Sequence, residues 1–471
     1  MLFSAKNEDY SATEWTRTES AVSKLRKIRY QQTIYGCCGR YGSTRLHYRM
    51  IIVSIIALLL LLFIWKNIPV LLPIGTSPKE LCPPPLSCGQ HEREDENPDI
   101  TLDYAAEVDE RLLHDDEHTT VGPPPILPDH LYMANWSEPR AKMHFSVVPD
   151  KVVESIYALV DGASCVHMVQ KKMYNAKFGI VIFVKSKTTN FDRRVAIRST
   201  WGQIYFLNQI RIEKVFVLGQ VDDPAAQENL QKEVETFGDI LQFEGPDDYR
   251  NMPIKVTSAM QWAAENLPAD YFYASTDDDF VVNFGNLVDF LEYEIKLKMF
   301  LSRKTDPSIT RELVREKSPI YCVYYFDKVK GPNRDNSSKW YVSKEEYSLE
   351  RYPPYCGGGF YIMSIAMAKD LYDISRVTKI LPMDDVWITG ILRQKLGQGD
   401  DNVVKAEWPK KDDQPLWKHL WGDYGRKKNV AKLLPPAWHE WNRKVANRPH
   451  CTRNFDASTV KYVYKNADEN T

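Results

Sequence analysis

Three consecutive carboxylates, Asp277–Asp279, directly follow the apolar run Tyr271–Ala274. A strand that ends in acids places dense negative charge at the carboxyl edge of a sheet, where open α/β sheets bind their ligands. Carboxylates this close repel one another unless a cation or hydrogen bonds compensate them. Oxygen-only clusters suit a hard divalent ion, which commonly bridges to substrate phosphates. The pattern therefore indicates a metal and phosphate site, with an exposed acidic turn that caps the next helix as the alternative.

Two further segments could bind an anion at the same edge of the sheet. Residues 193–202 (RRVAIRSTWG) bring arginines, which offer bidentate contacts to phosphate. A helix with an exposed basic face is the alternative for this segment. Residues 247–251 (DDYRN) form a predicted turn, and Lys255 follows near the start of a helix, where phosphate binds favourably.

Two segments later in the chain could handle a sugar. Residues 352–360 (YPPYCGGGF) combine three glycines, which let the backbone approach a ligand closely, with aromatic side chains that could form a platform for a sugar ring. Cys356 suggests that a disulfide holds this loop, although a plain loop is the alternative. In residues 382–386 (PMDDV), Asp384 and Asp385 precede a stretch of helical character, so they are either helix caps or the source of a general base.

The elements that must position these segments alternate between strand and helix. Continuous apolar runs predict strands buried on both faces, and apolar residues at helical spacing predict helices between them. This alternation implies a largely parallel, nucleotide-binding type of sheet. The expected strands are Phe178–Val184, Lys214–Gly219, Asp239–Phe243, Tyr271–Thr276 and Ile320–Tyr325, and the expected helices are Pro224–Thr236, Pro253–Leu267 and Trp387–Leu392.

The N-terminal third has a different character. Residues 50–65 contain one polar side chain, Ser54, and with an extension to residue 74 they predict a single-pass signal anchor, with a buried core helix as the alternative. Nine Lys and Arg against four acids in residues 1–49 predict a cytosolic N-terminal tail and a luminal remainder. The proline-rich, acidic residues 75–150 predict an extended stem, which leaves residues 151–471 for a catalytic domain.

The predicted membrane orientation divides the eight cysteines into a cytosolic and a luminal group. Cys37 and Cys38 would face the cytosol, where they stay unpaired thiols unless they are palmitoylated. The other six would face an oxidising compartment, and their even number is compatible with disulfides: Cys82, Cys88, Cys165, Cys322, Cys356 and Cys451. Sequons at Asn135 and Asn336 fit the same secretory location.

Five segments, in order over roughly residues 177–400, resemble the inverting β-1,3-glycosyltransferases of glycosyltransferase family 31, which include β-1,3-galactosyltransferases and β-1,3-N-acetylglucosaminyltransferases. They are RRVAIRSTWG, DDYRN with its lysine, TDDDFVVN, KWYVSKEEY with YPPYCGGGFYIMS, and MDDVWITG. The resemblance implies a GT-A fold, which is an α/β, Rossmann-like nucleotide-sugar domain with a mixed central sheet. It also implies a UDP-sugar donor, Mn²⁺ or Mg²⁺, and a type II Golgi membrane protein whose luminal catalytic domain acts on a glycoprotein or glycolipid glycan. No nucleic-acid partner is expected.

The resemblance also assigns roles by position. Asp279 and Asp277 are expected at the metal, Asp279 as the direct ligand and Asp277 to orient the ribose or a metal-bound water. Asp385 is the expected catalytic base. The base would take a proton from an acceptor hydroxyl while that hydroxyl attacks the anomeric carbon from the opposite face. Donor contacts are expected from Arg194, Arg198, Asp247, Tyr249, Lys255, Asp278 and Asp277, with Gly357, Gly358 and Gly359 beside the transferred sugar and acceptor. His419, His439 and His450 are candidates for an additional metal ligand.

Departures from the family pattern leave the transferred sugar open among galactose, N-acetylglucosamine and N-acetylgalactosamine. Ser275 stands where many members have lysine, and Glu244 and Pro253 replace the usual Asp and Thr. Two other functions also stay open. A catalytically silent glycan-binding or chaperone-like membrane protein on the same fold would need no general base, and a hydrolase of nucleotide sugars would release free sugar with or without acceptor.

Overall fold

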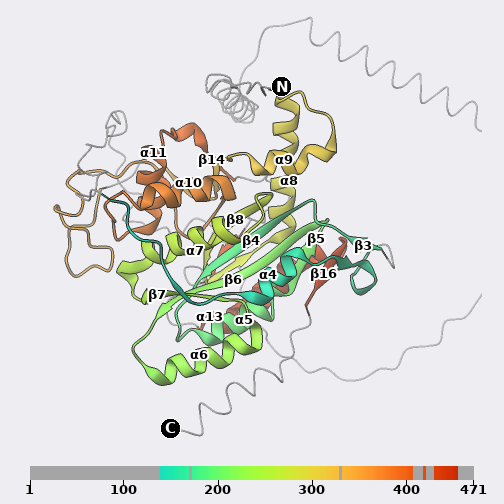
Figure 1. The fold of residues 1–471 in the computed structure, drawn as a ribbon, viewed down its shortest axis with the longest axis horizontal. Coiled ribbons are helices and arrows are strands. Elements are labelled where there is room, and N and C mark those ends of the chain that lie inside the picture. The colour runs from blue at the N-terminus through green and yellow to red at the C-terminus, as the bar shows by residue number, and fades with distance from the viewer. Residues whose placement is uncertain (1–137, 169–171, 328–330, 407–416, 421–428, 454–471) are drawn as a thin grey trace, which may run out of the picture. The chain divides into compact units, whose positions relative to one another are not determined.

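A mixed β-sheet forms the centre of the computed structural model, which describes residues 138–168, 172–327, 331–406, 417–420 and 429–453 (Figure 1). The strand order is β1-β7-β6-β4-β8-β13-β10-β14, and β5 links β16 to β6. The strands of this sheet are β1 Phe145–Val147, β4 Phe178–Lys185, β5 Ile204–Leu207, β6 Ile210–Gln220, β7 Ile240–Pro246, β8 Tyr271–Asp277, β10 Ile320–Cys322, β13 Phe360–Ser364, β14 Val403–Lys405 and β16 His450–Thr452.

The middle of the sheet is parallel, because β4 pairs in parallel with both β6 and β8, and β6 pairs in parallel with β7. Among these parallel strands β4 comes first in the chain, β6 and β7 follow on one side of it, and β8 then lies on its other side. The strand order therefore reverses between β4 and β8. A reversal of this kind is the point at which open α/β sheets bind ligands, at the carboxyl ends of the strands.

Helices cover both faces of the sheet, which explains why the apolar run of β4 is buried along its whole length. Ile180 and Ile182 pack on one side with α5, α8 and α13, whereas Val181 and Phe183 pack on the other with α4, α7 and α10 (Figure 1). The helices are α4 Asp150–Tyr157, α5 Phe191–Arg198, α6 Pro224–Phe237, α7 Met252–Asn266, α8 Phe284–Leu301, α9 Thr310–Arg315, α10 Ile365–Ser375, α11 Arg393–Lys395 and α13 Val430–Ala446.

The mixed α/β architecture with a central sheet is confirmed, with two local differences. The apolar run expected as one strand over Ile320–Tyr325 divides into β10 and β11 (Tyr325–Phe326), because β10 stays in the main sheet while β11 pairs with β12 (Tyr355–Cys356). The helical stretch near residue 387 is a π-helix over Val386–Leu392.

The folded unit begins earlier than the boundary expected at residue 150. β1 pairs with β7, and α4 already starts at Asp150 and buries Val152 and Ile156. Residues 145–147, which fall within the stem expected over residues 75–150, thus form a strand of the main sheet. β1 has only three residues, all partly exposed, so it produces no apolar run that the sequence could reveal.

Two disulfides, Cys165–Cys451 and Cys322–Cys356, confirm that cysteines of the C-terminal part pair with one another. The cysteines at positions 37, 38, 82 and 88 lie outside the described residues, as do the anchor expected over residues 50–74 and the sequon at Asn135. Within the ranges that the structure describes, no helix has the length and hydropathy needed to cross a membrane.

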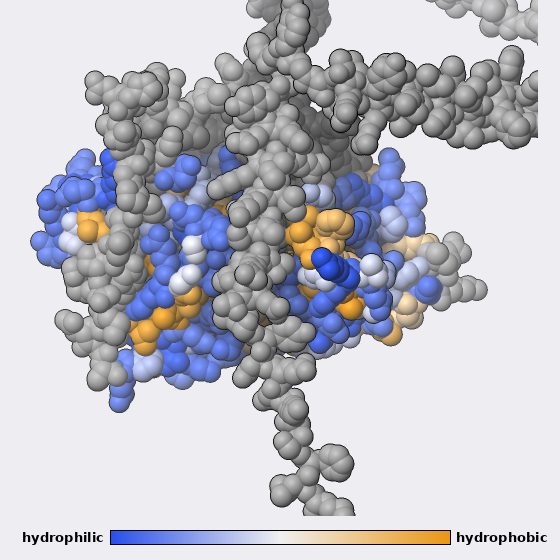
Figure 2. Space-filling view, turned by 90° about the horizontal axis from the view of Figure 1, so that it is seen from above, coloured by the Kyte–Doolittle hydropathy of each residue, from blue (hydrophilic) through white to orange (hydrophobic). Residues whose placement is uncertain are grey.

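The face shown in Figure 2 is largely hydrophilic, with apolar side chains in small, separate patches. Exposed large apolar residues in the described ranges include three aromatics, of which Tyr249 belongs to the anion-binding segment 247–251. Tyr249, Tyr324 and Trp340 are 38%, 48% and 42% exposed. Isolated exposed apolar residues are normal on a protein surface, so exposure alone does not mark these three as functional. Their interest comes from the residues that lie beside them.

Candidate active site

A buried lysine joins the acidic segments at the point where the strand order reverses. Lys185 ends β4 and lies opposite Asp277, the last residue of β8. Its ammonium lies 3.0 Å from Asp277 Oδ1 and 3.2 Å from Asp384 Oδ2, and it donates a 2.9 Å hydrogen bond to the Gly358 carbonyl. Burial alone would lower the pKa of Lys185, but the two carboxylates outweigh it and raise the pKa well above its ordinary value. Asp277 and the Asp384–Asp385 pair thus share one cation.

Asp385, the expected base, has a pKa near neutrality. Burial and the neighbouring charge of Asp384 raise it to about 7, against the opposing effects of the Val386 amide, Lys185 and the Gly358 amide. Its Oδ1 accepts a 2.8 Å hydrogen bond from the Val386 amide at the start of the π-helix. A carboxyl group with such a pKa can gain and lose a proton at physiological pH, as a general base must.

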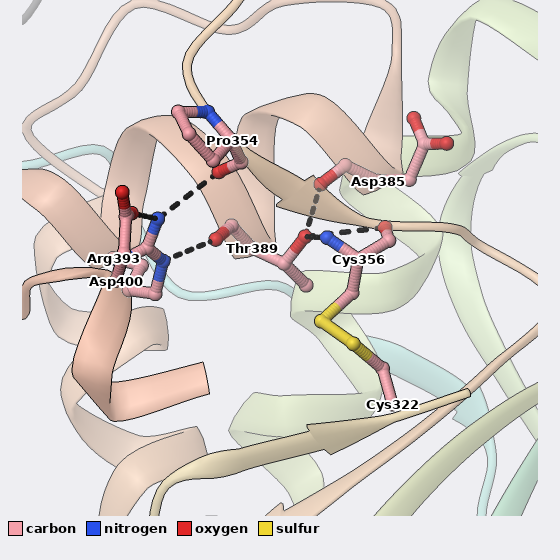
Figure 3. The surroundings of a disulfide bond; sticks show 7 residues. All are labelled: Cys322, Pro354, Cys356, Asp385, Thr389, Arg393 and Asp400. Carbon is pink, nitrogen blue, oxygen red and sulfur yellow. Dashed lines mark hydrogen bonds and ion pairs between the residues drawn. A yellow bond between two sulfur atoms is a disulfide. The ribbon is translucent and has the colours of Figure 1, made fainter. Parts of the chain in front are cut away.

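The π-helix and a disulfide fix the backbone of Asp385 (Figure 3). Thr389 Oγ1 donates to the Asp385 carbonyl over 2.7 Å and accepts from the Cys356 amide over 2.8 Å, while Cys356 is bonded to Cys322 of β10. Arg393 is fully buried and donates to the Thr389 carbonyl and, over 3.0 Å, to the Pro354 carbonyl. π-helical turns are rare and frequent at functional sites. Hydrogen bonds and the disulfide therefore hold the glycine loop and the expected base in a fixed position relative to each other.

The glycines of the loop bring its backbone close to both sides of the site. A Cβ on Gly359 would lie 2.5 Å from the Phe280 ring, directly after the triple acid, so this position excludes a side chain. A Cβ on Gly358 would lie 3.4 Å from Asp385 Cβ, which is ordinary contact. The Gly358 amide also hydrogen-bonds to the Asp385 carboxyl group. Gly357 lies against Tyr324 and Phe326 and so faces the exposed aromatics.

Asp279 has one carboxylate oxygen without a hydrogen-bond partner. Its Oδ1 is buried and unpaired, whereas its Oδ2 lies 3.5 Å from Nε2 of His419. The short strand β15 (Trp417–His419) pairs with β9 (Phe280–Val282), and the His419 ring stacks on Phe280 with centroids 4.5 Å apart. Carboxylate and imidazole ligands with an unpaired oxygen fit a divalent ion that takes further oxygens from substrate phosphate.

Of the three candidate histidines, the structure thus places His419 beside the triple acid. His450 belongs to β16 and contacts the Arg448 carbonyl over 2.8 Å, and His439 belongs to α13. In the part of the chain that the structure describes, no three or more His, Cys, Asp or Glu side chains form a ready metal-holding group. The fit therefore rests on Asp279 and His419, with Asp277 close enough to feel the charge of Asp279.

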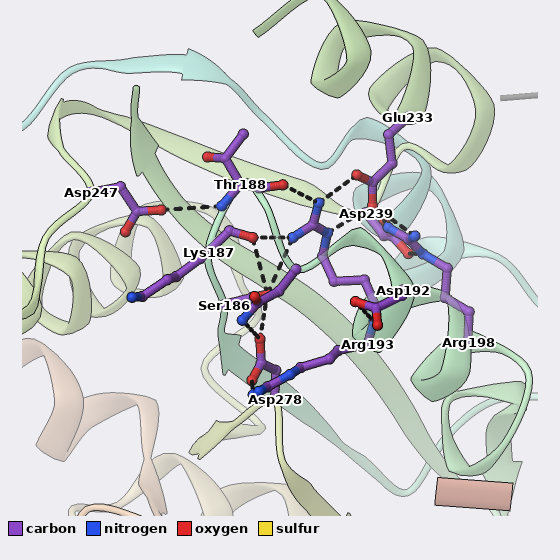
Figure 4. A network of polar contacts seen from close by, with 12 residues as sticks. Ser186, Lys187, Thr188, Asp192, Arg193, Arg198, Glu233, Asp239, Asp247 and Asp278 are labelled. Atoms are coloured by element: carbon purple, nitrogen blue, oxygen red, sulfur yellow. Dashed lines mark hydrogen bonds and ion pairs between the residues drawn. The ribbon is translucent and has the colours of Figure 1, made fainter. Parts of the chain in front are cut away.

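Asp278 differs from its two neighbours because the protein occupies both of its oxygens (Figure 4). Oδ2 accepts from Ser186 Oγ over 2.7 Å and from Asn190 over 2.8 Å, and Oδ1 accepts from Arg193 over 2.7 Å. Asp278 thus anchors the loop between β4 and α5.

Arg194 and Arg198 have partners behind that loop. Arg194 donates to both oxygens of Glu233 and to the carbonyls of Lys187 and Thr188, and Arg198 pairs with Glu233 and Asp239 (Figure 4). Arg194, Arg198 and Glu233 are buried, and the Asp239 side chain is 17% exposed. The two arginines expected at the donor therefore hold the loop and α6 in place.

In the second anion-binding segment, Lys255 and Asp247 also have partners within the protein. Lys255 is buried, donates to the Ser186 carbonyl over 2.6 Å and pairs with Asp247, whose other oxygen accepts from the Thr188 amide. Tyr249 instead points toward the acids. Burial, followed by the charges of Asp384, Asp385 and Asp277, raises the pKa of its phenol to about 12. Among the five residues expected at the nucleotide outside the triple acid, Tyr249 has the exposed side chain.

Glu233→Ala should destabilise the protein strongly, because it leaves two buried guanidinium groups without their shared carboxylate. We expect a loss of about 3–5 kcal/mol in the free energy of unfolding, measured by denaturant titration. Glu228→Ala on the same helix is the control, since Glu228 has a side chain 72% exposed. A Glu233→Ala loss no larger than that of the control would contradict the framework role.

Comparison with known proteins finds similarity to galactosyltransferases. Residues 192–399 match the family model described as Galactosyltransferase. Over 218 residues the chain is 32% identical to β-1,3-galactosyltransferase 1 of Homo sapiens and 33% identical to β-1,3-galactosyltransferase brn of Drosophila melanogaster. Each alignment covers 46% of this chain and 60% of the relative, so the chain spans less than two thirds of their length.

A third relative, β-1,3-galactosyltransferase 5 of Homo sapiens, is 30% identical over 217 residues, covering 46% of this chain and 63% of its own. These matches confirm the resemblance to β-1,3-glycosyltransferases. The residues matched by the family model include the triple acid, the glycine loop and Asp385, whereas Lys185 and His419 lie outside them. A solved structure titled "WbbM bifunctional glycosytransferase apo structure" aligns with 63% of this chain and 54% of its own at 10% identity and a TM-score of 0.28, too low to inform the fold.

Proposed function

We propose that this chain is a metal-dependent, inverting glycosyltransferase of the GT-A type. It moves a hexose or N-acetylhexosamine from a UDP-sugar to a glycan hydroxyl in β-1,3 linkage. The observation that carries the proposal is the meeting of Asp277 with the Asp384–Asp385 pair around Lys185 at the reversal of strand order. A donor-binding acid and a group able to act as a base thus lie at one edge of the sheet, as a displacement reaction requires.

Each residue of the site has a part in the proposed mechanism. Asp385 accepts the proton of the acceptor hydroxyl as that hydroxyl attacks the anomeric carbon, and the Val386 and Gly358 amides hold the carboxylate that does so. Asp279 and His419, with Asp277 nearby, are the residues that would hold the divalent ion. When bound, this ion neutralises the negative charge that develops on the departing UDP.

Exposed aromatics beside the base supply the acceptor platform in this proposal. Burial and the charges of Asp384 and Asp385 raise the pKa of Tyr249, and Tyr324 lies against Gly357 of the loop. The Lys339 ammonium lies 4.5 Å from the Trp340 ring centroid and 5.6 Å from that of Tyr249, which links the two rings. Aromatic faces of this kind suit the apolar faces of sugar rings.

The proposed location is the Golgi lumen, with residues 50–74 as a type II anchor and a glycoprotein or glycolipid glycan as the acceptor. The two disulfides support an oxidising compartment, because such bonds are rare in the cytosol.

A donor screen tests the proposed activity. The purified full chain is incubated with UDP-galactose, UDP-N-acetylglucosamine or UDP-N-acetylgalactosamine, a panel of glycan acceptors, and either Mn²⁺ or a chelator. The expected result is acceptor-dependent, Mn²⁺-dependent transfer with a β-1,3 linkage in the product. Free sugar released equally with and without acceptor would indicate a hydrolase instead. No consumption of any donor would favour a silent glycan-binding protein.

Turnover should depend on pH through Asp385. Its carboxyl group is protonated below a pKa of about 7 and cannot then accept a proton. We therefore expect kcat to fall about tenfold for each pH unit below that value and to level off above it. The measurement is initial rate against pH at saturating donor, with UDP binding followed in parallel. A rate that is flat between pH 5 and pH 8 would contradict the assignment.

A further inference from the structure

Lys185 occupies a position that packing alone does not explain. Its side chain is 4% exposed at the end of an otherwise apolar strand, yet its ammonium group has acceptors from three separate segments. Asp277 comes from β8, Gly358 from the loop between β12 and β13, and Asp384 from the turn before the π-helix. A buried ion pair is weak evidence for stability, since an apolar residue of similar volume often serves packing equally well.

The three contacts connect the donor side of the site with the base by two short routes. Asp384 is the residue directly before Asp385 in the chain. The Gly358 carbonyl accepts from Lys185, while the amide of the same residue bonds to the Asp385 carboxyl group. Asp277 lies on the other side of the ammonium group at the end of the neighbouring strand. An ammonium group has three donors, and these three acceptors can use all of them.

We propose that Lys185 is a positioning residue of the transfer reaction, which sets the separation between the donor-side acid Asp277 and the base Asp385. This inference rests on the proposed function and adds a specific residue to it. Without the cation, Asp277 and Asp384 would face one another as like charges and move apart. The base would then shift relative to the donor, and a misplacement of about 1 Å is enough to cost about 10²-fold in rate.

The test compares Lys185→Met, Lys185→Arg and a control. Lys185→Met removes the charge at similar length, and its kcat should fall about 10²-fold, while the KM for the UDP-sugar and the calorimetric affinity for UDP with Mn²⁺ stay within about threefold. Lys185→Arg keeps the charge and should recover kcat to within about tenfold of the wild type. Lys177→Met, at a lysine 44% exposed just before the same strand, should match the wild type.

Two outcomes would overturn the positioning role in an active enzyme. A Lys185→Met variant with kcat within about threefold of the wild type would show that the separation does not depend on the lysine. Equal losses in kcat and in UDP affinity would show that Lys185 binds the donor directly. If Lys185→Met does not fold, the same comparison is made with Lys185→Gln, which keeps a hydrogen-bond donor without the charge.

A readout independent of activity is the coupling between Lys185 and Asp384. Lys185→Met and Asp384→Asn should each change the thermal midpoint, and the double variant should be more stable than the sum of the two shifts predicts, because each removes the partner of the other. Additive shifts would contradict the contact itself. If the wild-type chain transfers no sugar, both the proposed function and the positioning role are refuted. If the wild type is active and Lys185→Met is equally active, the positioning role alone is refuted.

Discussion

The Asp385→Asn variant is expected to lose about 10²-fold or more in turnover while it still binds the donor. Asparagine has the shape of aspartate and can still accept a hydrogen bond from the Val386 amide, so the backbone of the π-helix should not move. It cannot accept the proton of an acceptor hydroxyl. The measurement is kcat with the best donor and acceptor, together with calorimetry of UDP and Mn²⁺.

The stability of the Asp385→Asn variant shows whether the loss of turnover comes from unfolding. The pKa of Asp385 fixes the direction in which stability should change with pH. Folding raises the pKa of Asp385 to about 7, so its contribution to stability is present below its ordinary pKa and is lost as pH rises through about 7. At pH 8 the asparagine variant removes a buried charge, and its thermal midpoint should equal or exceed that of the wild type. Asp373→Asn, at a carboxylate 49% exposed on α10, should change neither property. Transfer at the wild-type rate by Asp385→Asn would refute the base assignment.

The Asp279→Ala variant is expected to lose metal-dependent UDP binding, by about 10²-fold in affinity, which corresponds to about 2.7 kcal/mol. The reason is the buried, unpaired Oδ1 of this carboxylate beside His419. Calorimetry with UDP should show tight binding in Mn²⁺ and weak binding with chelator for the wild type. The variant should bind weakly in both conditions.

His419→Ala tests the second proposed ligand in the same assay. It should reduce the Mn²⁺-dependent part of UDP affinity less than Asp279→Ala does, since the carboxylate brings both an oxygen ligand and a charge. His450→Ala is the matched control, because His450 lies in β16 and contacts the Arg448 carbonyl. An Asp279→Ala variant with unchanged UDP affinity in Mn²⁺ would remove Asp279 as a ligand.

Local sequence pattern was enough to predict the parallel centre of the sheet and the position of its acids, whereas β1, β5, β13, β14 and β16 were not predicted. The apolar run that became β4 has one buried environment on each face, so its composition alone signals a strand between helix layers. Asp277 and Asp385 each follow or precede a regular element, so their placement at an element end could be predicted from sequence. The π-helix was visible only as helical character, because its hydrogen-bonding pattern has no distinct composition.

The sequence by itself therefore determined the α/β class, the acidic strand end and the family resemblance, because these depend on residue types at short spacing. Only the tertiary structure decided which charged residues face one another. It turned Arg194, Arg198, Asp247, Lys255 and Asp278 toward buried partners, and it brought Lys185 and His419 to the triple acid from segments far away in the chain. Parallel register sets Lys185 of β4 opposite Asp277. Which residues pair across strands depends on register and side-chain direction. Neither can be predicted from the spacing of residues along one segment.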